Sequence, residues 1–299
     1  MRAGVAAALV VALGLAPRAE AFVRTHVDPN DLESPCLFWD RRTVPYQLSQ
    51  RGLIGATDES PIFDSLRTSL RQWTDVACSD FAYEDQGLSQ SVEVGFNKVL
   101  LNQPMLVEVV KPENTVLFRD ALCEQVVPAG DACLDPANDD CASRFDCWGY
   151  GDGVIALTTT TYNFQTGEIF DGDIELNEAE FQFTTADPPA PSCQPGSSTG
   201  CIGTDLRNTV THEAGHLLGL GHSGDPESTM FLSAGSGETL KRDLAQDDID
   251  GLCSIYPAGK PPSTCGEIVD APSGCSSAEG DLALPWLLVM LCLVRRRRT

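Results

Sequence analysis

The sequence predicts an α+β fold, because it carries both helical and strand periodicity over extended stretches. Residues 58–78 place apolar side chains at helical spacing. Residues 170–177 instead alternate between apolar or small residues and polar ones, which is the period of a β-strand. Residues 243–256 return to helical spacing. The apolar positions of the two helices are Ile62, Phe63, Leu66, Leu70 and Trp73, then Leu244, Ile249, Leu252 and Ile255.

The first half of the chain is expected to contain a strand, a helix and further strands. Val44, Tyr46 and Leu48 alternate as in a strand. Ser60 can cap the helix, and Pro61 suits its first turn. The expected elements are a strand within residues 34–50, the helix over 58–78, a short strand over 92–96 and at least one strand within 107–118.

The second half is expected to contain a cysteine-rich loop, two strands and two helices. Residues 154–162 are rich in β-branched side chains, which favour strands. Thr204 or Asp205 can cap the helix that follows and that runs to about Leu218. The expected elements are a disulfide-closed loop over 131–153, strands over 154–162 and 170–177, a Pro- and Ser-rich loop over 185–203, the capped helix, and the closing helix over 243–256.

Both ends of the chain look like targeting segments rather than parts of the fold. Residues 1–21 combine Arg2, an apolar stretch and small residues at Ala19 and Ala21, which is typical of a secretory signal peptide cut before Phe22. Residues 282–294 are apolar but too few to span a bilayer, and arginines follow them. This tail resembles the myxobacterial C-terminal sorting signal, with residues 274–277 as its recognition segment. A weak, unprocessed membrane anchor is the alternative.

The cysteines favour disulfides over metal binding. Of 12 cysteines, ten lie between Cys36 and Cys265, and no C-x-x-C pair occurs. In an exported chain, an even and high count indicates disulfides. The connectivity stays open. Local loops are expected within Cys133/Cys141/Cys147 and within Cys193/Cys201, and a tie is expected from Cys36 to Cys78.

The charge balance is strongly acidic, with a formal net charge of −23. This argues against nucleic acid or an anionic membrane surface as a partner. Clustered carboxylates also suit a calcium ion, which prefers oxygen ligands, whereas the alternative is a solvated acidic surface. The candidate calcium ligands are Asp152, Asp171 and Asp173.

The most specific motif reads HEAGHLLGLGH, from His212 to His222. His212 and His216 are four residues apart, so both leave one face of a helix and can reach the same metal ion. Gly219 permits a turn that brings His222 back as a third ligand. Three protein ligands leave the fourth position of a tetrahedral zinc ion open, as in catalytic sites.

Glu213 lies between the first two histidines, where a carboxylate can reach a zinc-bound water without binding the metal. The motif therefore predicts Glu213 as the general base of a hydrolase. Chance is a weak alternative, because the chain has four histidines and three of them belong to this motif.

The residues after the motif resemble the matrixins, a family of metzincin zinc peptidases. Residues 228–230 read Ser-Thr-Met and look like the Met-turn, whose methionine lies beneath the three imidazoles. Residues 244–252 and the ending at residues 254–256 are similar to the matrixin pattern for the last helix. The resemblance covers about residues 36–256 and is loose before residue 154.

The resemblance implies a metzincin fold: a twisted mixed sheet with an antiparallel edge strand, three main helices, and a cleft between a large N-terminal and a small C-terminal subdomain. It implies one catalytic zinc on His212, His216 and His222. A substrate peptide is expected to lie antiparallel to the edge strand at residues 154–162. The main specificity pocket is expected near Val210 and residues 232–236.

Two matrixin features are missing from the sequence. No Pro-Arg-Cys-Gly string occurs, and Cys36 lies in Ser-Pro-Cys-Leu, so latency by a cysteine switch is not expected. Only His26 lies outside the zinc motif, so a second, histidine-bound zinc is not expected either.

The sequence therefore predicts a monomeric zinc metalloendopeptidase that is secreted or attached to the cell surface and that hydrolyses extracellular proteins. The tail would attach it to a membrane transiently or permanently. The alternatives are a non-catalytic, zinc-holding extracellular binding protein on the same scaffold and a hydrolase of another amide or ester. The expected parts are a signal peptide (1–21), the catalytic domain (22–256), a linker (257–274) and the tail (275–299).

Overall fold

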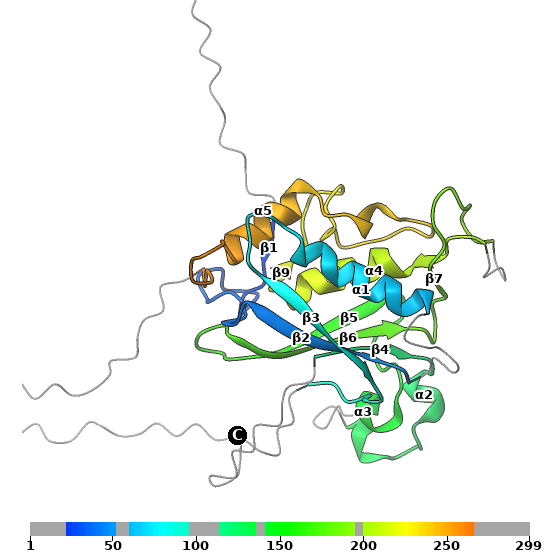
Figure 1. Cartoon of the computed structure of the whole chain (residues 1–299). Coiled ribbons are helices and arrows are strands. Elements are labelled where there is room, and N and C mark those ends of the chain that lie inside the picture. The colour runs from blue at the N-terminus through cyan, green and yellow to red at the C-terminus, as the bar shows by residue number, and fades with distance from the viewer. Residues whose placement is uncertain (1–21, 52–59, 96–113, 136–140, 195–199, 266–299) are drawn as a thin grey trace, which may run out of the picture. The chain divides into compact units, whose positions relative to one another are not determined.

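The computed structural model describes residues 22–51, 60–95, 114–135, 141–194 and 200–265 of the chain (Figure 1). All of them belong to one unit. The elements are β1 (Val23–Arg24), β2 (Thr43–Ser49), α1 (Pro61–Thr74), β3 (Ala82–Ser89), β4 (Thr115–Arg119), α2 (Cys123–Val126), η2 (Ala132–Leu134), α3 (Cys141–Phe145), β5 (Ala156–Tyr162), β6 (Ile169–Asn177), β7 (Phe183–Thr184), β8 (Thr204–Asp205), α4 (Leu206–Leu217), β9 (Leu220–Gly221), η3 (Leu240–Arg242) and α5 (Gln246–Ile255).

The centre of the fold is a five-stranded sheet in the order β3-β2-β4-β6-β5. Its strands are parallel except for β5, which lies at the edge and runs antiparallel to β6 with Thr159 opposite Asp173. Two short two-stranded pairs, β1-β9 and β7-β8, complete the strand pairing. The predicted class is confirmed: a mixed sheet with an antiparallel edge strand and three main helices, α1, α4 and α5.

Helices α1 and α4 cover one face of this sheet (Figure 1). Trp73 of α1 is fully buried and donates its indole N–H to the carbonyl oxygen of Thr211 in α4, at 2.8 Å. Tyr83 of β3 donates its hydroxyl to the carbonyl oxygen of Ala214 at 2.6 Å. A Cβ on Gly172 of β6 would lie 2.2 Å from a methyl of Leu217, so a larger residue there would require the Leu217 side chain of α4 to move.

The other face of β6 is buried too, although the alternating pattern predicted a polar face there. It consists of Asp171, Asp173, Glu175 and Asn177, each at most 3% exposed. Glu175 pairs with the fully buried Arg119, whose Nε lies 2.7 Å from the carboxylate. A buried carboxylate requires such partners, because its desolvation is otherwise too costly.

Two local predictions in the first half were wrong. Residues 92–95 form no strand; the third strand is β3, which is mostly polar and so lacks the expected apolar alternation. The segment that follows β3 instead crosses the sheet, and there the carbonyl oxygen of Val92 accepts a hydrogen bond from Arg119. Ser60 stands at the N-cap of α1, but its hydroxyl makes no capping hydrogen bond. Of residues 107–118, the structure describes the end, which contributes to β4.

The closing helix was predicted correctly, but not all of its buried residues. Leu252 and Ile255 are fully buried, whereas Leu244 and Ile249 are only partly so. Asp248 of this helix, which was not among the predicted buried residues, is buried with 0% of its surface exposed.

Five disulfides pair the ten cysteines between Cys36 and Cys265. The predicted tie from Cys36 to Cys78 was wrong, because each of these two cysteines meets the C-terminal part of the described chain instead. The local loop closures at Cys133–Cys141 and Cys193–Cys201 are confirmed. The pairs are Cys36–Cys265, Cys78–Cys253, Cys123–Cys147, Cys133–Cys141 and Cys193–Cys201.

The predicted signal peptide (1–21) and C-terminal tail (275–299) lie outside the described residues. Within the described part of the chain, no helix has the length and apolar character needed to cross a membrane.

Candidate metal centre and cleft

Helix α4 and the turn after it place three histidines together. Asp205 caps the helix by accepting the N–H of Asn208 at 2.8 Å, as one of the two predicted caps. Gly219 ends the turn at a φ of +107°, and a Cβ there would lie 2.4 Å from the carbonyl oxygen of Leu37. Only glycine fits that backbone and that contact. The chain then pairs β9 with β1 and delivers His222 over the helix.

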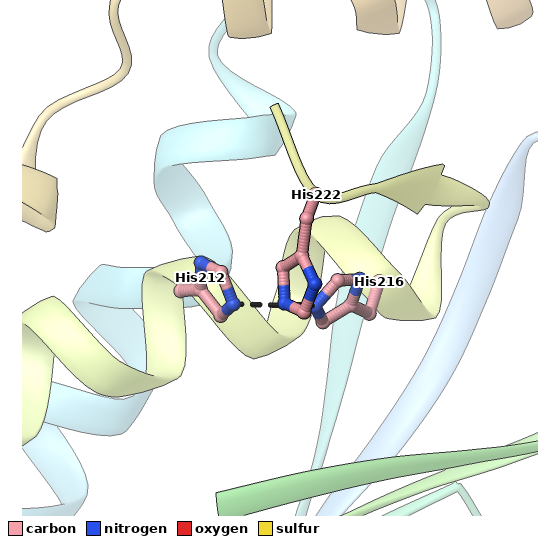
Figure 2. Close-up of side chains that lie close together, drawn as sticks. All are labelled: His212, His216 and His222. Carbon is pink, nitrogen blue, oxygen red and sulfur yellow. Dashed lines mark hydrogen bonds between the residues drawn. The ribbon is translucent and has the colours of Figure 1, made fainter. Parts of the chain in front are cut away.

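The three imidazoles converge through their Nε2 atoms, as Figure 2 shows. Nε2 of His216 lies 3.2 Å from that of His212 and 3.1 Å from that of His222. A tetrahedral zinc with bonds of ~2.0–2.1 Å separates its ligand nitrogens by about 3.3 Å. The spacing of the donor atoms therefore fits one zinc ion. Among the described residues, this triad is the one group of histidine, cysteine or acidic side chains arranged to share a metal.

Hydrogen bonds fix the orientation of two of the rings. Nδ1 of His212 lies 2.7 Å from the carbonyl oxygen of Thr229, and Nδ1 of His216 lies 2.8 Å from that of Leu220. A carbonyl oxygen only accepts, so each Nδ1 carries the hydrogen and each Nε2 keeps its lone pair. Burial, with a smaller contribution from His216, lowers the pKa of His212 to about 3. The neutral ring is the form that binds a metal.

Glu213 is buried beside the triad and lines the cleft in front of it. Its Oε2 accepts the hydroxyl of Thr158 from edge strand β5 at 2.6 Å. Burial raises the pKa of Glu213 above its usual value, against the opposing effects of His216 and Thr158. Thr158 was not singled out from the sequence, since threonine is common in strands and its contact with α4 depends on the fold.

Residues 228–230 lie beneath the histidines. Met230 is 2% exposed, and its sulfur would be 2.2 Å from a Cβ on Gly215, so the methionine packs directly against α4. The carboxylate of Asp248 accepts four hydrogen bonds, three of them from this turn. Its donors are the Ser228 hydroxyl at 2.6 Å and the backbone N–H groups of Thr229, Ala245 and Met230 at 2.8, 2.8 and 3.1 Å.

Asp248 was not predicted as a supporting residue. The one indication in the sequence was the position of Asp248 in the first turn of the last helix, where an acidic side chain can accept the N–H of the residue that precedes the helix. Its contacts with residues 228–230 come from tertiary packing.

The cleft has a volume of about 760 Å³ and runs along α4 between β5 and the loop after Met230. Of residues 232–236, which were predicted as a wall of the specificity pocket, Leu232, Ser233 and Ala234 line the cleft, and Gly235 and Ser236 line a second cavity. Val210 does not line it, since it is fully buried in the core, and its neighbours Asn208 and Thr209 face the cleft instead. The second cavity, of about 410 Å³, adjoins the cleft beyond these residues.

The three candidate calcium ligands do not form one metal-binding group, although Asp171 and Asp173 interact with each other. Asp171 and Asp173 lie on the buried face of β6, and Asp173 already accepts the N–H groups of Gly95 and Thr115 at 2.6 and 2.8 Å. Asp152 is exposed in the turn before β5.

The mixed sheet, its antiparallel edge strand and the three converging histidines on and after a helix are the arrangement that the resemblance to the metzincins predicted. Comparison with known proteins gives a match to the same family over part of the chain. Residues 148–257 match the family model described as Matrixin. This match begins before β5 and includes the triad and the last helix.

Three curated relatives are similar to parts of the chain. Metalloendoproteinase 1-MMP of Arabidopsis thaliana is 44% identical over 221 residues, 73% of this chain and 44% of the relative. Matrilysin of Homo sapiens is 35% identical over 98 residues, 33% of this chain and 32% of the relative. Metalloendoproteinase 1 of Glycine max is 52% identical over 52 residues, 17% of each. The chain thus spans less than half the length of each relative. The names of these relatives are those of metalloendopeptidases, the class that the sequence predicted.

Proposed function

We propose that this protein is an exported endopeptidase that binds one catalytic zinc through His212, His216 and His222 and uses Glu213 as its general base. The observation that carries the proposal is the set of three closely spaced Nε2 atoms, beside a buried carboxylate, in an open cleft. The names of the matched relatives support the reaction class.

Zinc in this site would polarise the scissile carbonyl and lower the pKa of a water from about 15.7 towards about 7. Glu213 takes the proton of the attacking water and delivers it to the leaving amine. The Thr158 hydroxyl holds the carboxylate in place. No covalent bond between enzyme and substrate is required.

Edge strand β5 is the proposed docking site for the substrate backbone. In the described sheet β5 pairs with β6 along one side and lines the cleft with Leu157, Thr158 and Thr160. An extended peptide can add to its other side through main-chain hydrogen bonds, which select for peptides over small amides.

The central experiment measures metal and turnover on the same sample. The full chain, produced in an oxidising compartment, is assayed on casein before and after chelation and again after stoichiometric zinc is returned. Loss and recovery of hydrolysis in step with zinc content support the proposal. Zinc binding without hydrolysis would instead support the alternative, a zinc-holding extracellular binding protein.

A peptide series addresses the second alternative, a hydrolase of another amide or ester. Turnover should rise with peptide length as more residues pair with β5. A rate that is the same for a dipeptide amide and a decapeptide would contradict the endopeptidase proposal.

Export, the tail and the extracellular substrates belong to the same proposal. Support comes from the five disulfides, which form in oxidising compartments. We expect the N-terminus of the isolated protein to be Phe22, the ten paired cysteines to resist thiol labelling, and the tail from residue 275 to be used for surface attachment. Retention of residues 1–21, or labelling of several cysteines before Cys265, would contradict export.

We also propose that the protein binds a calcium ion and is a monomer. Asp171 is 3% exposed, and its Oδ2 has no hydrogen-bond partner among the described residues, so this oxygen is available to coordinate a calcium ion. Calcium-dependent thermal unfolding tests the ion, and light scattering tests the monomer.

A further inference from the structure

A buried lysine stands at the inner end of the cleft. The Lys241 side chain is only 3% exposed, yet it contributes to the cleft lining. Its ammonium donates to the carbonyl oxygen of Ser233 at 2.8 Å and forms an ion pair with Glu238. Its backbone N–H donates to the side-chain oxygen of Asn208 at 2.8 Å, so Lys241 is held against the first turn of α4.

Lys241 lies within reach of a substrate side chain. The α4 residues that line the cleft include Asn208, His212 and His216, which lie on one face of the helix. At ~1.5 Å of rise per residue, Asn208 lies about 6 Å along the axis from His212. Because Lys241 is held at Asn208 and lines the same cleft as the triad, a long side chain next to the bond being cleaved can extend from the triad towards Lys241.

The two partners of this ion pair line two different cavities. Lys241 lines the cleft, whereas Glu238 lines the second cavity together with Glu180 and Asp205. Burial opposes ionisation of Glu238, but the hydrogen bonds from Lys241 and Gly235 outweigh it and lower its pKa. The anionic form of Glu238 is thus favoured, and its partner Lys241 lines the cleft.

We propose that Lys241 is a specificity-determining residue that makes the cleft select a substrate side chain ending in a hydrogen-bond acceptor, glutamate first and glutamine second. This inference rests on the proposed peptidase function. An ammonium has three hydrogens, of which Ser233 and Glu238 take two. A carboxylate accepts the third, a leucine leaves it unpaired in a dry site, and a lysine meets a like charge.

The experiment uses quenched fluorescent peptides that differ only at the two residues flanking the cleaved bond, each set in turn to Glu, Gln, Leu or Lys. The wild-type chain should show kcat/KM on the order of tenfold higher for Glu than for Leu at one of these positions. Lys241→Met keeps the unbranched stem and removes the charge, so it should abolish or reverse that ratio. Lys241→Arg should keep it. Lys260→Met, an exposed lysine outside the cleft, is the matched control.

A double variant, Lys241→Met with Glu238→Gln, replaces the ion pair by neutral groups and guards against misfolding of the single variant. Thermal unfolding of each variant reports whether the fold is retained. An unchanged Glu-to-Leu ratio in a folded variant would overturn the role of Lys241, and so would a wild-type preference for Leu or Lys at both positions.

Peptide binding separates this inference from the peptidase proposal. Zinc-loaded Glu213→Gln chains, with and without Lys241→Met, are titrated with the Glu and Leu peptides by fluorescence anisotropy. If the Glu peptide binds preferentially in a way that depends on Lys241, but the wild type hydrolyses no peptide, the peptidase proposal is contradicted and the role of Lys241 is supported. If the wild type hydrolyses the peptides without such a preference, the role of Lys241 is contradicted and the peptidase proposal is supported.

Discussion

The carbonyl oxygen of Thr229 lies 2.7 Å from Nδ1 of His212 and directs that ring's Nε2 towards the other two histidines. Thr229 is itself held by Asp248, whose carboxylate accepts its N–H at 2.8 Å. A residue of the last helix thereby positions a proposed metal ligand on α4, although Asp248 is not part of the triad.

Asp248→Asn should destabilise the fold and weaken zinc binding. Each carboxylate oxygen of Asp248 accepts two hydrogen bonds, and an amide offers only one acceptor oxygen, so its NH₂ group would face two donors. We expect the free energy of unfolding to fall by about 2–3 kcal/mol and zinc affinity to fall roughly 10–100-fold. Chemical denaturation and competitive zinc titration measure these. Asp250→Asn, on the exposed side of the same helix, is the control and should leave both unchanged.

His222→Ala should remove most bound zinc. His222 supplies one of three converging nitrogens, and two imidazoles bind zinc far more weakly than three. Metal content after exhaustive dialysis is the measurement, with His26→Ala as control because that histidine lies outside the triad. Stoichiometric zinc in the His222 variant would refute the three-histidine site.

The sequence was sufficient to predict that the three histidines converge, because they are close together in the chain. Helical spacing places His212 and His216 together, and a single glycine turn returns His222, so few tertiary contacts are needed. The same holds for Asp205 as the helix cap. These patterns are read over a dozen residues and do not depend on the rest of the chain.

The roles of Asp248, Thr158 and Lys241 were not predicted, because each acts across a contact between elements distant in the sequence. An acidic residue near a helix start is ordinarily solvated, and nothing local shows that Asp248 meets residues 228–230. The buried acidic face of β6 was missed for a related reason: alternation shows that two faces differ, not that one is exposed.

Glu213→Gln should retain zinc and lose nearly all hydrolysis. The amide keeps the size of the carboxylate and its bond with Thr158, but it cannot take a proton from water. We expect kcat to fall on the order of 10²–10⁴-fold with metal content unchanged. Glu227→Gln, an exposed residue on the loop after the triad, controls for handling and charge. A Glu213 variant with more than about a tenth of wild-type turnover would remove Glu213 as the general base.

Asp171→Asn should change how stability depends on pH. Burial raises the pKa of Asp171 from 3.8 to about 6 in the folded chain. A folded-state pKa above the unfolded one means that the folded chain binds the proton more tightly, so this stability is complete below about pH 3.8 and is lost as the pH rises through about 6. With calcium removed by EGTA, the wild type should therefore lose thermal stability relative to Asp171→Asn between pH 4 and pH 7. Asp152→Asn, at an exposed position, is the control and should follow the wild type.

Calcium added to the same samples tests the ion. If calcium binds the ionised Asp171, it should flatten the dependence of wild-type stability on pH and leave the Asp171 variant unchanged. If thermal stability depends on pH in the same way for the wild type and Asp171→Asn in EGTA, the pKa of Asp171 is not raised in the folded chain.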